Sequence, residues 1–156
     1  MTTLDDAAAL GSPETGLAVS STLRADASIQ STVINAGAID HPATGRRVLA
    51  FVTYGKVKMA NLRIRPQIAV TFRHGWQWAT VEGRVELAGP DDPQPWLSDA
   101  DQLRVLIRDI YRAAGGTHED WNEFDRVMLH QRRCAVLITP TRVYSNRPGS
   151  AAQQQD

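Results

Sequence analysis

The sequence predicts a mainly β protein with helices: an antiparallel barrel of about six strands, closed or split, against which helices pack. Two observations predict this class. Short runs of β-branched and apolar residues, separated by turn residues, fill the first half of the chain. Helix-period apolar patterns appear only later, between residues 98 and 130. A parallel doubly wound sheet would alternate strands with helices throughout, and the first half of this chain does not.

Composition predicts one cytoplasmic domain. The chain has 156 residues and 42% hydrophobic residues, which is enough for a single sizeable core. Its formal net charge is zero, so we expect no general attraction to nucleic acid or to a membrane surface. Cys134 is the single cysteine, which fits a reducing compartment. Residues 1–16 lack the basic start and apolar run of a signal peptide, and no stretch is apolar over the length of a membrane span.

Residues 1–14 are expected to form a flexible arm or a short helix, residues 15–146 the folded domain, and residues 147–156 a polar, disordered tail. The domain opens with a hairpin of strands 17–23 and 29–35, and a loop at 37–45 leads on. Strand 48–53 is almost wholly apolar, which predicts burial on both faces. A helix at 57–65 and strands at 68–73 and 76–87 follow, with a bulge expected at Gly83.

The last third is expected to be helical up to a final strand at 135–144, where Pro140 indicates an edge or a bulge. Ser98 and Asp101 have capping-box spacing before the first helix, and Thr117 and Asp120 before the second. The first helix has an apolar stripe of helical period, made of Leu103, Leu106, Ile107, Ile110, Tyr111 and Ala114. Gly115 and Gly116 end it, and Trp121, Phe124 and Met128 share one face of the second helix.

Motifs of nucleophilic, metal or phosphate-loop chemistry are absent from the sequence. The four histidines are isolated from one another and from cysteine, so no metal site is expected. Cys134 opens an apolar strand and is expected to be a small buried side chain. Tyr54, Tyr111 and Tyr144 are able to donate a proton, but nothing ranks any of them above a structural tyrosine, so no catalytic residue is assigned.

The strongest local feature is a basic helix start. Residues 41–81 contain no acidic residue, and Lys56 and Lys58, the only lysines in the chain, lie there where strand 48–53 enters the helix. The helix dipole disfavours cations at this position, so the two lysines make sense if an anion such as a phosphate binds there. Thr53 and Tyr54 can add hydroxyl donors, and Asn61 is expected near Lys58 on the helix surface, one turn further on. The alternative is a pair of ordinary solvated lysines on a basic surface.

These residues carry a resemblance. Thr53, Lys58, Asn61-Leu62 and Pro66, followed by the strand IAVTF, resemble the motif of the split-barrel flavin and deazaflavin oxidoreductases, the pyridoxamine 5'-phosphate oxidase-like superfamily. The likeness runs from Leu17 to Tyr144 and is greatest to the branch that uses the deazaflavin coenzyme F420. It implies an FMN-binding-like split barrel, peripheral helices, and a homodimer with the cofactor cleft at the subunit interface.

The resemblance also implies roles for single residues. Lys58 would bind the cofactor phosphate with help from Thr53 and Asn61. The strand that meets the flavin-like ring corresponds to residues 31–35, which gives Ser31, Thr32 and Asn35 as ring contacts. Trp76 and Trp78 are candidates for the cleft wall, contributed by either subunit, with core packing or a dimer contact as the alternative.

Lys56 is a departure, because many relatives have a small hydroxyl residue there. Its extra charge suits F420, which carries a phosphodiester and a carboxylate-bearing tail. A composition rich in arginine and poor in lysine suggests a GC-rich genome, such as those of the actinobacteria, and also favours F420 over the alternative, FMN. The expected function is an F420-dependent reductase of a small unsaturated or conjugated substrate. An FMN oxidase or reductase and a non-catalytic cofactor carrier remain alternatives. A nucleic-acid-binding barrel is disfavoured by the zero net charge.

Overall fold

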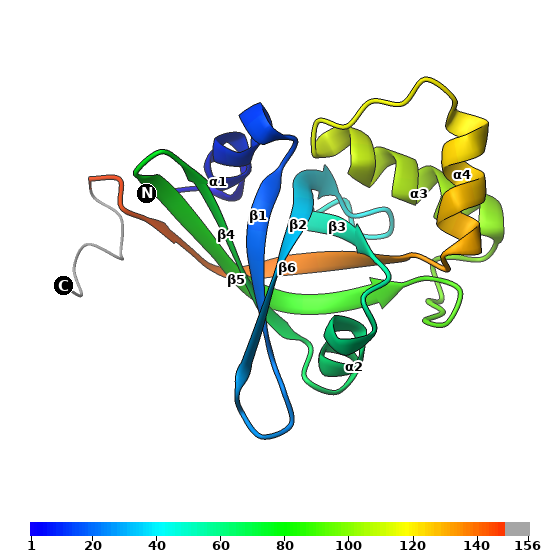
Figure 1. The fold of residues 1–156 in the computed structure, drawn as a ribbon, viewed down its shortest axis with the longest axis horizontal. Helices are drawn as coiled ribbons and strands as arrows, with labels where there is room; N and C mark the ends of the chain where they lie inside the picture. Colours follow the sequence, from blue (N-terminus) through cyan, green and yellow to red (C-terminus); the bar gives the residue numbers. More distant parts are fainter. Residues whose placement is uncertain (149–156) are drawn as a thin grey trace.

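The computed structural model describes residues 1–148 and shows a closed barrel of six antiparallel strands in the order β1-β2-β3-β6-β5-β4 (Figure 1). Four α-helices and one short 3-10 helix accompany the barrel within these residues. In chain order the elements are α1 (Leu4–Gly11), η1 (Ser12–Glu14), β1 (Leu17–Leu23), β2 (Ile29–Asp40), β3 (Arg47–Thr53), α2 (Lys56–Ile64), β4 (Gln67–His74), β5 (Gln77–Ala88), α3 (Ala100–Ala113), α4 (Trp121–His130) and β6 (Cys134–Ser145). The predicted fold class, a six-stranded antiparallel barrel with peripheral helices, is confirmed.

Strand β2 is longer than predicted. Residues 37–40, which we expected in a loop, pair with β3, so the loop prediction for 37–45 was wrong over its first part. Gly37 is required here because a Cβ on it would lie 2.4 Å from the backbone of Ala113 at the end of α3. The first half of β2 therefore pairs with β1 and the second half with β3, which turns the sheet toward closure.

Strand β3 is buried on both faces, as its apolar sequence predicted. Leu49 and Phe51 point into the barrel core. Val48 and Ala50 lie on the other face, in a second apolar cluster that includes Leu106 and Ile110 of α3. The helix stripe predicted from the sequence therefore packs on the outside of the barrel.

The bulge predicted near Gly83 is confirmed by a register shift between β5 and β6. Glu82 pairs with Arg142 and Gly83 with Pro140, so Thr141 has no partner in the ladder. A Cβ on Gly83 would lie 2.4 Å from the carbonyl oxygen of Thr139, so only glycine fits this close approach.

The N-terminal residues form a helix, the second of the two alternatives left open by the sequence. Thr3 and Asp6 form a reciprocal capping box at the start of α1. Leu4 and Ala7 are buried in the barrel core, and the hydroxyls of Thr2 and Ser145 share a hydrogen bond of 2.5 Å. Figure 1 shows α1 and α2 at opposite ends of the barrel. Residues 1–14 are thus a packed part of the domain and no flexible arm, while most of the predicted tail lies outside the described residues.

The two late helices begin later than predicted. The N-cap of α3 is Asp99 and not Ser98, because the Asp99 carboxylate accepts the Gln102 N–H at 2.8 Å. The N-cap of α4 is Asp120 and not Thr117, whose carbonyl oxygen accepts the Tyr111 hydroxyl instead. Within residues 1–148, every helix falls short of the length and apolar character that crossing a membrane requires.

Candidate cofactor site

A cavity of about 280 Å³ lies beside the N-terminus of α2. Strand β3 ends at Thr53, whose hydroxyl oxygen accepts the Gly55 N–H at 3.3 Å and so shapes the turn into the helix. The lining includes three of the residues predicted for the site, namely Thr53, Tyr54 and Lys56. The structure thus brings together the strand end and the helix start that the sequence singled out.

The N-terminus of α2 has no side-chain cap. Thr3, Asp99 and Asp120 each accept backbone N–H groups at the start of α1, α3 and α4. Gly55 cannot do so for α2, and the first turn of α2 contains no acidic residue. The free N–H groups and the positive end of the dipole therefore face basic side chains, which is the arrangement that an anion stabilises.

Lys58 does not line this cavity, but it is the most unusual of the residues predicted for the site. Its relative exposure is 6%, and its ammonium lies 5.5 Å from the centroid of the Phe51 ring. Within the described residues, no carboxylate pairs with this ammonium and no hydrogen bond involves it. Burial lowers the pKa of Lys58, since removal from water disfavours the charged form. A cation that is partly removed from water and has no partner is costly, so the position fits an anionic group that the chain itself does not supply.

Neighbouring charges are mostly paired. The Arg63 guanidinium donates to both carboxylate oxygens of Asp92, at 2.9 and 2.8 Å, and Arg132 donates to Asp91 at 3.2 and 2.5 Å. These two pairs cancel their own charge on the cavity wall. Lys56, like Lys58, forms no ion pair in residues 1–148, so the uncompensated charge around the cavity is positive.

Asn61 is buried, whereas the sequence predicted it on the surface of the helix. It is buried on the barrel side of α2, and its amide donates a hydrogen bond of 3.1 Å to the hydroxyl oxygen of Thr22 in β1. The Thr22 hydroxyl donates in turn to the Gln30 side chain at 3.2 Å. In this structure Asn61 therefore ties α2 to the β1–β2 hairpin. The inward-facing Thr22 was the signal that sequence reasoning missed.

The predicted ring contacts on β2 form hydrogen bonds with β1 and with Thr15, which precedes β1. The hydroxyls of Ser31 and Ser21 share a hydrogen bond of 3.0 Å, and Thr32 bonds with Ser20. The Asn35 amide donates to the carbonyl oxygen of Thr15 at 2.9 Å. Ser31 and Thr32 lie next to the part of the hairpin that α2 contacts, whereas Asn35 lies at the opposite end of the hairpin, by η1.

The two tryptophans lie far from α2 within one chain. Trp76 is in the β4–β5 turn and is 94% exposed. Trp78 is at the start of β5 and packs edge-to-face on Tyr144, with ring centroids 6.1 Å apart. Figure 1 shows the β4–β5 turn at the other end of the barrel from α2. One subunit alone therefore does not place either tryptophan beside Lys58.

The hairpin presents an apolar outer face. Leu17 and Val19 of β1 and Ile29 and Val33 of β2 are exposed, and Val19 pairs with Val33 in register. We call these four residues the hairpin face. Leu17, Val19 and Val33 are neighbours on this face, and the Ser21–Ser31 pair separates them from Ile29. Isolated exposed apolar residues are common, but several on one strand pair are typical of an interaction surface.

The histidines have structural surroundings. The Nδ1 of His41 accepts the N–H groups of Ala43 and Thr44, and its Nε2 lies 2.7 Å from a carboxylate oxygen of Glu86. His41 thereby holds the β2–β3 loop. In residues 1–148, no three His, Cys, Asp or Glu side chains gather as metal ligands.

No protein-family model matches this sequence. Solved structures do match. The conserved hypothetical protein Rv2991 from Mycobacterium tuberculosis aligns with a TM-score of 0.61 and 18% identity over 93% of this chain and 88% of that one. An F420 reductase aligns with a TM-score of 0.54 and 17% identity over 81% of this chain and 87% of that one. A pyridoxamine 5'-phosphate oxidase-related, FMN-binding protein from Nostoc punctiforme aligns with a TM-score of 0.55 and 14% identity over 88% of this chain and 79% of that one.

The chain has the six-stranded split-barrel fold of these solved structures. At these sequence identities the likeness shows the fold alone.

One residue of this split barrel escaped the sequence analysis. Arg133, just before β6, packs its guanidinium 4.2 Å from the centroid of the Tyr54 ring and forms no ion pair in the described residues. Burial lowers its pKa. It lies almost eighty residues from Tyr54 in the chain, and only the pairing of β3 with β6 brings the two together.

Proposed function

We propose that this split barrel binds coenzyme F420 and is an F420-dependent reductase of a small unsaturated or conjugated substrate. The observation that carries the proposal is Lys58, whose side chain is buried beside Phe51 and whose ammonium has no anionic partner in the described residues. In a split barrel, whose solved relatives include an F420 reductase and an FMN-binding protein, a cofactor phosphate is the anion best suited to that position. The bound cofactor would supply the hydride, so the chain needs no nucleophile of its own.

The residues near α2 have distinct parts in the proposal. Lys58 would pair with the phosphate, and the hydroxyl of Thr53 and the uncapped N–H groups of α2 would donate to it. Tyr54 would form a wall of the site. Asn61 would act indirectly, because its hydrogen bond to Thr22 fixes the position of α2 relative to the hairpin. The cleft would exclude water and orient the substrate.

F420 is favoured over FMN by the charge that remains after all ion pairs are formed. Lys56, which lines the cavity with Tyr54, is a cation without a carboxylate partner in the described residues. A single phosphate dianion would be satisfied by Lys58 and the helix N-terminus. The phosphodiester and carboxylate tail of F420 offers further anions, which Lys56 would meet.

The proposed active form is a homodimer with the cofactor cleft at its interface. The hairpin face would be covered by a second copy of the chain, which would bury four apolar side chains that water now contacts. Such a pairing would also allow Trp76 or Trp78 of one subunit to line the cleft of the other, and Ser31, Thr32 and Asn35 to lie beside a ring there. No single chain achieves this arrangement.

Titration of the purified protein with F420 and with FMN, side by side, tests the proposal. F420 is expected to bind at least tenfold more tightly, as read from its fluorescence. Tighter binding of FMN would instead favour the second candidate, an FMN-dependent oxidase or reductase. Turnover of a panel of enones and quinones with reduced F420 then distinguishes a reductase from a protein that only carries the cofactor. Absence of binding by both cofactors would contradict the proposal.

A further inference from the structure

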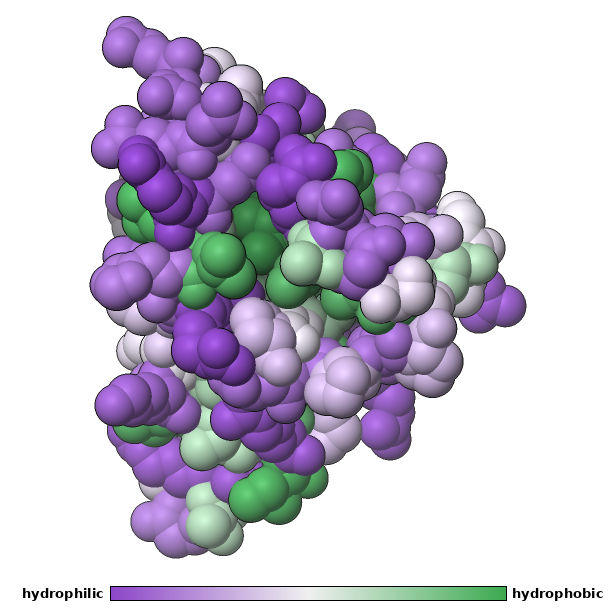
Figure 2. All heavy atoms as spheres, turned by 90° about the vertical axis from the view of Figure 1, so that its right-hand side faces the viewer, coloured by the Kyte–Doolittle hydropathy of each residue, from purple (hydrophilic) through white to green (hydrophobic). Residues whose placement is uncertain are grey.

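A second cavity lies between α3 and α4, outside the candidate cofactor site. Its volume is about 340 Å³, and its apolar lining includes Leu103, Ile107, Met128 and Leu129. This volume lies within the range of small-molecule sites. Figure 2 shows this side of the molecule, where apolar side chains gather near the middle and hydrophilic ones surround them.

The two helices contact each other at the end away from this cavity and through ion pairs to Asp125 on its wall. Tyr111, Trp121 and Phe124 form an aromatic cluster there, with Tyr111 and Phe124 centroids 4.8 Å apart. Arg108 and Asp125 form a two-pronged ion pair that closes the middle of the interface. Beyond that pair the helices leave the cavity open. Leu129, on its wall, is 66% exposed, which is unfavourable unless something covers it.

The charged rim of the cavity favours an anion. Asp125 is already paired with Arg104 and Arg108, and Asp101 with Arg104. Arg126 and Arg133 also line the cavity, and neither forms an ion pair in residues 1–148. The carboxylates on the rim are therefore satisfied, and two guanidinium groups are not.

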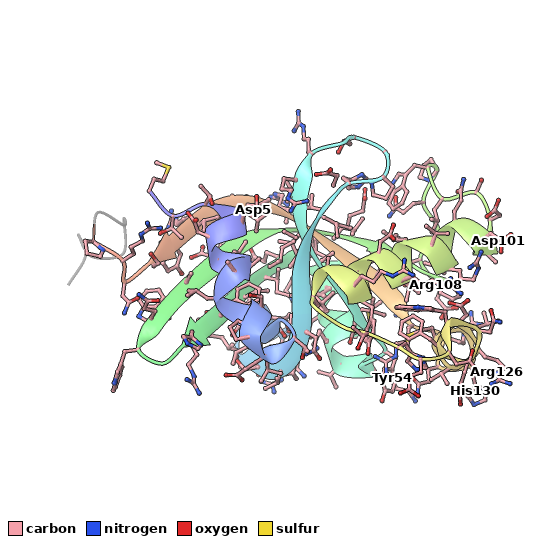
Figure 3. The ribbon with its side chains drawn as sticks, turned by 90° about the horizontal axis from the view of Figure 1, so that it is seen from above. Asp5, Tyr54, Asp101, Arg108, Arg126 and His130 are labelled. Atoms are coloured by element: carbon pink, nitrogen blue, oxygen red, sulfur yellow. The ribbon has the colours of Figure 1, made fainter. Side chains whose placement is uncertain are left out.

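Arg133 is the better placed of the two. Its ring contact with Tyr54 and the hydrogen bond of 2.8 Å from its Nε to the Gln131 side chain fix the orientation of its guanidinium. Its terminal nitrogens have no partner among the described residues. A held, planar guanidinium at the edge of an apolar cavity suits the two oxygens of a carboxylate. Figure 3 shows Tyr54 on the same side of the molecule as Arg126 and His130 of α4.

We propose that the cavity between α3 and α4 binds a small amphipathic carboxylate, with the apolar body between Leu103 and Met128 and the carboxylate on Arg133. This site is separate from the cofactor site, although Pro90 lies on the walls of both cavities. It would take straight-chain or aromatic monocarboxylates of about ten non-hydrogen atoms. A second copy of the chain or a cationic ligand are the competing occupants.

The methionines make the test direct. Met128 lines the proposed site, Met59 lines the cofactor cavity, and Met1 lies on neither wall. The full chain labelled with methyl-13C-methionine is titrated with octanoate, and with 1-octanol and octylammonium as charge controls. Octanoate is expected to shift the Met128 methyl signal saturably, with a dissociation constant on the order of 0.1 mM, and to leave Met1 and Met59 unshifted. Octylammonium is expected to bind at least tenfold more weakly.

Substitutions at two neighbouring arginines complete the test. Arg133→Gln is expected to weaken octanoate about tenfold and leave 1-octanol unchanged, and Arg133→Lys to lie between Gln and the wild type. Arg132→Gln is the matched control, because Arg132 is exposed and paired with Asp91, and it is expected to change octanoate binding less than about twofold.

Four results would overturn the proposal. These are no saturable Met128 shift at millimolar octanoate, equal binding of octanoate and 1-octanol, equal loss in the two Gln variants, and a Met128 shift that depends on protein concentration without ligand. The last result would assign the cavity to a second copy of the chain. The Met59 signal reports the cofactor site separately, so failure there leaves this test intact.

Discussion

The ammonium of Lys58 lies 5.5 Å from the centroid of the Phe51 ring, and it has no anionic partner in the described part of the chain. The ring face gives a weak attraction that does not replace the water lost on burial. The fold therefore holds a charge in an unfavourable position. Binding sites often have this character, because a ligand supplies the missing interaction.

Lys58→Met is expected to stabilise the protein without ligand by about 1 kcal/mol, which corresponds to a rise in Tm of about 2–4 °C. The methionine keeps the apolar stem and removes the buried charge. Thermal unfolding measures the change. Lys56→Met is the matched control, because Lys56 is exposed, and it should leave Tm within about 1 °C.

The Tm of the wild type and the Tm of Lys58→Met should depend differently on pH. The pKa of Lys58 is lowered in the folded state, so between that pKa and the unfolded value of about 10.4 the unfolded chain binds more protons. The destabilisation by Lys58 therefore fades as pH rises through this window. The Tm difference between Lys58→Met and the wild type should be largest near neutral pH and shrink toward pH 10. A difference that grows with pH would contradict the assignment of a desolvated lysine.

Loss of the Asn61 to Thr22 hydrogen bond is expected to cost stability. Asn61→Ala should lower the free energy of unfolding by about 1–2 kcal/mol, because a buried hydrogen bond that ties α2 to β1 is removed. A double-mutant cycle with Thr22→Val should give a coupling energy of about 1 kcal/mol. Urea unfolding measures both quantities. Additive effects would show that the two side chains do not interact in solution.

Some elements of the fold were predictable from the sequence because they depend on local pattern. The apolar run of β3 and the glycine at the β5 bulge were both recognised, since each has its own local signature. The full length of β2 was not, because the small residues at 36–38 are strand-forming only where β3 and α3 pack closely on them. The strand that follows Arg133 pairs with the strand before Tyr54 from a distant part of the chain, so no local pattern connects the two residues.

The site residues likewise divide into those that a local pattern predicts and those that depend on packing between distant segments. Thr53, Tyr54 and Lys56 are neighbours in sequence and line one cavity. That Asn61 faces Thr22 and that Lys58 faces Phe51 depends on how α2 docks on the barrel, which helix periodicity does not specify. The place of Trp76 and Trp78 in a cleft depends on a second subunit and stays a prediction.

Cys134 is expected to be inert in the folded protein. Burial raises the pKa of its thiol to about 12, so only ~10⁻⁴ of it is ionised at pH 8, against roughly a quarter in an unfolded chain. A disulfide reagent at pH 8 should therefore modify it only as fast as the protein opens, and denaturant should make the reaction complete within minutes. Because the pKa of the Cys134 thiol is raised in the folded state, its protonated form contributes stability below about pH 8.5. This contribution is lost as pH rises toward 12. Rapid labelling of the native protein would contradict the burial of this thiol.

Val33→Asp is expected to separate the proposed dimer into monomers. Val33 is 63% exposed on the hairpin face, so a carboxylate there is harmless to a lone subunit and costly in an apolar interface. Sedimentation velocity measures the change, and circular dichroism checks the fold. Val105→Asp, at an exposed valine of α3, is the control and should leave the association state unchanged. Dimers of the Val33 variant, or monomers of the wild type at micromolar concentration, would refute this interface.

The most direct test of the central claim is a fluorescence titration of F420 into the wild type, Lys58→Met and Lys56→Met. The account predicts that Lys58→Met weakens F420 binding at least a hundredfold while its Tm rises, and that Lys56→Met weakens it about three- to tenfold. Unchanged affinity in the folded Lys58→Met protein would contradict the claim that the Lys58 ammonium is the cofactor's phosphate partner.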